Sequence, residues 1–212
     1  MARKGADYIG TMEVQEKHRF DESSLGRFMS ANVEGFTPPI RVEQFKGGQS
    51  NPTYRLTDGG GRRYVMRRKP PGKLLPSAHA VDREFRVIAA LNRTNVPTPR
   101  AYALCEDDSV AGTAFYIMEY CDGRVLWDPL LPDVPKEGRL AIYRAKFETL
   151  ARLHAVDYVA LGLGDFGRPG SYVARPITRW GQAVQGFRDR EDRSNGSSAR
   201  LAAGQPAAER RD

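Results

Sequence analysis

Long apolar runs and cysteines are both scarce in this chain of 212 residues. No stretch approaches the roughly 18 consecutive apolar residues of a membrane span, so we expect no membrane-spanning segment and no membrane partner. The first 20 residues are polar and charged, which argues against a secretory signal. The 2 cysteines, Cys105 and Cys121, have neither metal-ligand spacing nor the pattern of a disulfide framework. These absences predict a cytoplasmic protein.

Basic residues outnumber acidic ones, and the formal net charge is +7. The densest basic cluster consists of Arg62, Arg63, Arg67, Arg68, Lys69 and Lys73. In a nucleic-acid-binding protein we would expect such a cluster on a recognition helix or among exposed aromatic side chains. Here it spans a predicted strand and a Pro-Pro-Gly turn, so nucleic-acid binding is unlikely, and a solvated basic face is the plainer reading.

The N-terminal part of the chain predicts one helix. Residues 1–19 are polar, and we expect them to be loosely ordered. A helix then follows a cap at Asp21 and carries Leu25, Phe28 and Met29 on one face.

The middle of the chain predicts strands and two further helices. Asp58-Gly59-Gly60-Gly61 is a hairpin turn, because glycines supply the positive φ angles that such turns need. The predicted strands cover residues 40–45, 53–57, 63–69, 101–105 and 114–120, and the predicted helices cover 80–92 and 136–156.

This order of elements predicts an α+β fold with a five-stranded antiparallel sheet covered by one helix. We expect an N-terminal extension at residues 1–35, a sheet-containing lobe at 36–121 and the start of a helical lobe at 122–180. Residues 181–212 have few apolar side chains and no hydrophobic period. Ordering a chain costs roughly 1–2 kcal/mol per residue for the backbone, so this tail is predicted to be disordered.

A glycine-bearing turn separates the first two predicted strands. A turn without bulky side chains lets backbone N–H groups approach phosphate oxygens, and polar side chains can add further donors. A plain hairpin explains the turn about as well. The candidate phosphate-binding residues are Gly47, Gly48, Gln49, Ser50 and Asn51.

The features that follow come in the order that a kinase needs. Arg67 lies on the strand where kinases carry a phosphate-binding cation, and Glu84 on the next helix could pair with it. The alternative for Glu84 is a solvated helix residue. The last predicted strand leads into Glu119, Tyr120 and Cys121, where backbone groups would hydrogen-bond an adenine in an interlobe hinge. This order is more specific than any one feature.

With these features, the chain resembles the aminoglycoside phosphotransferase and choline kinase superfamily, and especially the kinase-like domain associated with certain acyl-CoA dehydrogenases. The resemblance covers about residues 36–180 and implies the protein-kinase fold. It also implies ATP and Mg²⁺ as cofactors and a small-molecule hydroxyl as phosphate acceptor, with a hydroxyacyl-CoA favoured. The residues that carry the match are Gly48 to Tyr54, Lys69 to Glu84, Phe115 to Gly123 and Gly162 to Gly167.

The chain departs from this family at two places. Arg67 stands where many kinases have lysine, and its planar fork binds phosphate with a different geometry. Lys69 is a nearby alternative cation. In addition, no histidine begins the His-x-Asp-x-x-x-x-Asn loop that supplies the catalytic Asp and a metal-binding Asn.

Two segments imitate the missing loop. His154 is followed by aspartate one position too late and lies in a periodic helix, which predicts a packing role. Asp165-Phe166-Gly167 precedes the place where the loop should lie, so a structural turn is expected there. We therefore assign no catalytic residue and no metal ligand, and we expect the chain to be inactive. A reading frame lost after Trp180 would explain the absence, and a non-catalytic nucleotide- or CoA-binding module is the alternative.

Overall fold

The structure is a computed structural model that describes residues 9–47, 51–72, 79–126 and 128–167, together with residues 177, 180 and 181. The chain divides into two compact units, Met1–Gly164 and Asp165–Asp212, and all the elements below belong to the first. The boundaries predicted at residues 35, 121 and 180 stay predictions. Disorder was predicted for residues 181–212, and of these only Gly181 is among the described residues.

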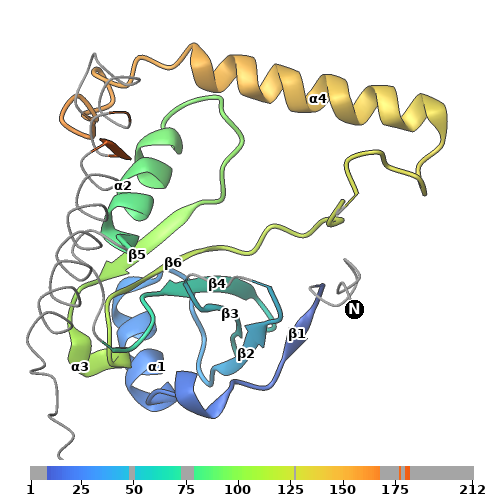
Figure 1. The fold of residues 1–212 in the computed structure, drawn as a ribbon. Coiled ribbons are helices and arrows are strands. Elements are labelled where there is room, and N and C mark those ends of the chain that lie inside the picture. Colours follow the sequence, from blue (N-terminus) through green and yellow to red (C-terminus); the bar gives the residue numbers. More distant parts are fainter. Residues whose placement is uncertain are drawn as a thin grey trace, which may run out of the picture. The chain divides into compact units, whose positions relative to one another are not determined.

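An antiparallel sheet of six strands forms the centre of the first unit (Figure 1). The spatial order is β1-β2-β3-β4-β6-β5, so the chain crosses over after β4 to reach the far edge. The strands are β1 (Thr11–Met12), β2 (Arg41–Phe45), β3 (Thr53–Thr57), β4 (Arg63–Arg68), β5 (Ala101–Cys105) and β6 (Phe115–Glu119).

The prediction of five strands was wrong by one edge strand. In β1, Thr11 pairs with Phe45 and Met12 pairs with Gln44, within the segment that was expected to be loosely ordered. A strand of two residues has no side-chain alternation to detect, so only its pairing with β2 reveals it.

The helices largely match the predicted ranges. One helix, α3, was not predicted from the sequence; Asp107 is its N-cap and Gly112, at φ +79°, is its C-cap. The helices are α1 (Glu22–Asn32), α2 (Val81–Leu91), α3 (Asp108–Ala111) and α4 (Lys136–His154), and a 3-10 turn, η2, covers Glu16–His18.

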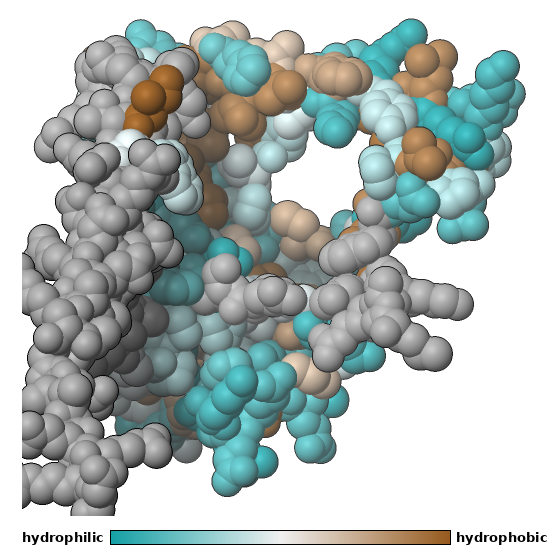
Figure 2. Space-filling model, viewed as in Figure 1, coloured by the Kyte–Doolittle hydropathy of each residue, from teal (hydrophilic) through white to brown (hydrophobic). Residues whose placement is uncertain are grey.

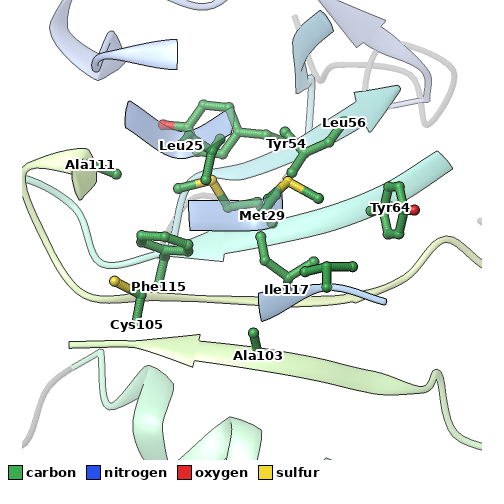
Figure 3. Close-up of a cluster of buried hydrophobic side chains, with 12 residues drawn as sticks. Leu25, Met29, Tyr54, Leu56, Tyr64, Ala103, Cys105, Ala111, Phe115 and Ile117 are labelled. Carbon is green, nitrogen blue, oxygen red and sulfur yellow. The ribbon is translucent and has the colours of Figure 1, made fainter. Parts of the chain in front are cut away.

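The sheet is covered by a helix on each face, which corrects the expectation of one covering helix. On one face Leu25 and Met29 of α1 are fully buried in a cluster that includes Leu56, Phe115 and Ile117 of the sheet (Figure 3). On the other face α2 packs against β5 and β6. Asp21 starts α1 by accepting hydrogen bonds from two backbone N–H groups of the first turn.

Strand β4 divides its side chains between these two faces. Tyr64 and Met66 are fully buried and belong to the cluster under α1. Because successive side chains point to opposite faces of a strand, Val65 and Arg67 project toward α2. Arg67 pairs directly with Tyr116 of β6, so the two side chains share that face.

Helix α4 has no buried residue in the described part of the chain. Its apolar side chains remain at the surface, as the brown positions along this helix in Figure 2 show. Among the described residues, no helix is both long and apolar enough to cross a membrane.

Candidate functional site

Arg67 and Glu84 form an ion pair on the α2 face of the sheet. The Nε atom of Arg67 donates to Oε2 of Glu84 over 2.6 Å, and its Nη2 atom donates to Oε1 over 3.3 Å. The side chains are 30% and 35% exposed. An ion pair with that exposure contributes about 1 kcal/mol or less to stability. Its main physical effect is therefore to hold the guanidinium fork in one orientation.

Tyr116 completes the contacts of Glu84 from the neighbouring strand. Its hydroxyl donates to Oε2 of Glu84 over 3.1 Å. Burial, followed by the negative charge of Glu84, raises the pKa of Tyr116 well above its ordinary value. The phenol therefore stays protonated at neutral pH and keeps its role as a donor.

Asn51 connects this pair to the glycine-bearing turn. Its side chain is directed inward, because the residue is only 2% exposed and its Nδ2 atom donates to Oε1 of Glu84 over 3.3 Å. Its Oδ1 atom lies 2.7 Å from Nδ1 of His79. Direct contact between Asn51 and a phosphate stays a prediction.

The rest of the turn is only partly described. Gly47 lies two residues beyond the end of β2, whereas the predictions for Gly48, Gln49 and Ser50 lie outside the described residues. Since Asn51 is anchored at Glu84, the C-terminal end of the turn lies beside the ion pair. This is the position that a phosphate-binding turn requires relative to its cation.

The hinge candidates have contacts of their own. The N–H of Glu119 donates to the carbonyl of Arg100 over 2.8 Å, so this donor is already used within the sheet. The ring of Tyr120 stacks on Phe45, with an angle of 11° between the planes. Cys121 is exposed, and partial desolvation, followed by the charge of Glu119, raises the pKa of its thiol. Adenine binding at these three residues stays a prediction.

The basic cluster does not form one continuous face. Arg67 lies on the α2 face, whereas Arg68 is 2% exposed and buried on the α1 face. Arg62 lies over the ring of Tyr102, and Lys73 is outside the described residues. A nucleic-acid surface would need these charges to point the same way.

The structure describes both of the segments that imitate the catalytic loop. His154 is exposed at the end of α4, so the packing role predicted for it is wrong. Asp165 lies in a turn, as expected. The described residues contain no group of three or more histidines, cysteines, aspartates or glutamates that could hold a metal ion.

A family model described as the phosphotransferase enzyme family matches residues 41–211. The chain belongs to this family. It is 54% identical over 174 residues to the "Probable acyl-CoA dehydrogenase IBR3" of Arabidopsis thaliana, a match that covers 79% of the chain and 21% of that protein. It is 45% identical over 175 residues to the acyl-CoA dehydrogenase family member 11 of Gallus gallus, covering 81% and 22%.

A solved structure extends this phosphotransferase relationship to the fold. The chain is 50% identical to a candidate aminoglycoside phosphotransferase from Ralstonia eutropha JMP134, with a TM-score of 0.68. That match covers 79% of this chain and 48% of the other. The chain thus spans about a fifth of the length of the curated relatives it matches. These matches confirm the resemblance and the α+β, kinase-like fold.

Two residues that contact the Arg67–Glu84 pair or Asn51 were not predicted from the sequence. Tyr116 looked like an ordinary strand residue, although its position opposite Arg67 follows once the register of β4 and β6 is known. His79 precedes α2 and has a φ of +59°, a conformation uncommon for residues other than glycine. Nothing in the local pattern of residues indicated either contact.

Proposed function

We propose that this chain carries the nucleotide-binding part of an ATP-dependent phosphotransferase. Arg67 would bind the phosphates, with the turn at residues 47–51 contributing backbone donors. The bidentate ion pair between Arg67 and Glu84 supports this role above all other observations. In kinases, a cation on this strand is held toward the nucleotide phosphates by a glutamate of the following helix.

The chemistry of Arg67 suits this task. The guanidinium is always charged at neutral pH and presents several N–H donors in one plane. Two of its nitrogens, Nε and Nη2, are committed to Glu84, and within the described residues its Nη1 makes no hydrogen bond. That nitrogen would be the donor available to a phosphate oxygen.

The acceptor would be the hydroxyl group of a small molecule. The relatives named acyl-CoA dehydrogenases favour a hydroxyacyl-CoA. Bound ATP supplies the phosphoryl group, and Mg²⁺ would be held by residues that this chain does not contain. We place the protein in the cytoplasm.

Turnover by this chain alone is not expected, because its 212 residues contain no His-x-Asp-x-x-x-x-Asn sequence. The same absence favours, as a second candidate, a non-catalytic module that binds a nucleotide or CoA. The two candidates differ in whether the addition of a catalytic loop restores transfer. Both require that Arg67 bind phosphate.

The test is to titrate the purified chain with MgATP by calorimetry. Replacing Arg67 by Met removes the charge-assisted hydrogen bonds, so we expect Kd to rise by about 10- to 100-fold. Arg62→Met is the matched control, because it removes the same charge from an exposed position near the start of β4. Equal affinities of the two variants would contradict the proposal. A second titration with CoA in place of MgATP shows which of these two ligands the chain binds.

A further inference from the structure

We propose that His79 and Asn51 are positioning residues that fix the Arg67–Glu84 pair relative to the phosphate-binding turn. This inference rests on the proposed function. His79 lies just before α2, whereas Asn51 ends the turn between β2 and β3. Their side chains meet across 28 positions of sequence, next to Glu84.

The direction of each hydrogen bond follows from the carboxylate. An ionised Glu84 can only accept, so the amide of Asn51 must present its Nδ2 atom to Glu84. The Oδ1 atom of Asn51 is then left facing Nδ1 of His79, 2.7 Å away. Because Oδ1 can only accept, His79 must donate from Nδ1. This donor and the Glu84 carboxylate therefore favour the same orientation of the Asn51 amide.

Three residues donate hydrogen bonds to the carboxylate of Glu84. Oε1 accepts from Asn51 and from Nη2 of Arg67, and Oε2 accepts from Nε of Arg67 and from Tyr116. Each donor removes one way in which the carboxylate could rotate. Loss of the His79 donor would remove one of the two contacts that hold the Asn51 amide and would loosen its hydrogen bond to Oε1, although Arg67 itself is unaltered.

The position of His79 adds a second observation. Its φ of +59° is uncommon for a residue with a side chain, so a glycine would be the easier choice for the backbone. Asparagine also tolerates this conformation, and its Nδ2 atom stands close to the place of Nδ1 in histidine. The chain therefore offers variants that separate the backbone from the donor.

The experiment compares His79→Asn, His79→Gly and His79→Ala by calorimetric titration with MgATP. Loss of one neutral hydrogen bond corresponds to a weakening of about 2- to 10-fold, which we expect for the glycine and alanine variants. The asparagine variant should recover most of the affinity. If the glycine variant binds as well as the unaltered chain, only the backbone matters at residue 79 and the inference fails.

Adding His79→Ala to the Arg67→Met variant distinguishes a purely structural role of His79 from a positioning role. If His79 acts through Glu84 on Arg67, then His79→Ala should have no further effect on MgATP affinity once Arg67 is replaced. An equal loss in both backgrounds would overturn the inference.

A ligand-free readout separates this inference from the proposed function. The Nε–H proton of Arg67 donates to Glu84 over 2.6 Å, so we expect it to exchange slowly with solvent. NMR should show its exchange accelerated in His79→Ala and restored in His79→Asn. Unchanged exchange in His79→Ala sinks the positioning role whether or not MgATP binds. If the exchange responds but the unaltered chain binds no MgATP, the proposed function fails and the network stands.

Discussion

Replacing Leu25 by Ala tests whether α1 is part of the folded core. Leu25 is 0% exposed and packs with the side chains that line one face of the sheet. Truncation of a fully buried leucine removes apolar contacts and leaves a cavity, which costs about 2–5 kcal/mol. In a unit of this size, the corresponding fall in the melting temperature is roughly 4–20 °C.

The matched control is Leu140→Ala in α4. The substitution and the helical setting are the same, but Leu140 is 63% exposed. Exposed substitutions of this kind change stability by about 0.5 kcal/mol or less. Urea unfolding followed by circular dichroism measures both variants. If Leu25→Ala costs no more than Leu140→Ala, then α1 does not contribute to the stability of the core beneath it.

Two further predictions concern the hairpin and the N-terminal segment. Gly59→Ala should lower the free energy of unfolding by about 1–3 kcal/mol, because a Cβ atom would lie 2.5 Å from the carbonyl oxygen of Pro38. Gly123→Ala, where a Cβ meets nothing within 4 Å, is the control, and equal unfolding midpoints would refute the steric argument. Burial lowers the pKa of His18 below its ordinary value of 6.5. As the pH falls, His18 therefore takes up a proton in the unfolded chain before it does so in the folded chain. The free energy of unfolding should consequently fall as pH drops below about 7. Urea unfolding at pH 5.5 and pH 7 measures this change, which should be smaller in His18→Gln. An equal change in the free energy of unfolding in both proteins would show that His18 does not cause it.

The Arg67–Glu84 ion pair was predicted from the sequence. Arg67 and Glu84 could be matched from the sequence because each lies in a regular element and because the order of elements resembles a known family. The hairpin at residues 58–61 was equally readable, since its glycines restrict the possible turns. The hairpin depends on neighbours a few positions apart, which the sequence displays directly, whereas the ion pair spans 17 positions and was matched through the family resemblance.

Contacts between distant segments were not readable in the same way. The second covering helix, the edge strand β1 and the link from His79 to Asn51 all depend on which segments meet after folding. An amphipathic helix carries an apolar face but does not specify which face of a sheet it covers. His79, which itself has a positive φ, likewise gives no sign in the sequence of its hydrogen-bond acceptor 28 positions away.

The sequence by itself therefore determined the family, the order of the main elements and the charged pair at the site. Only the tertiary structure decided that Glu84 is held by four hydrogen bonds and that Asn51 faces inward. The physical reason is that hydrogen bonds need donors and acceptors within about 3 Å of each other. Packing of the whole sheet and its helices sets that separation, which no local pattern contains.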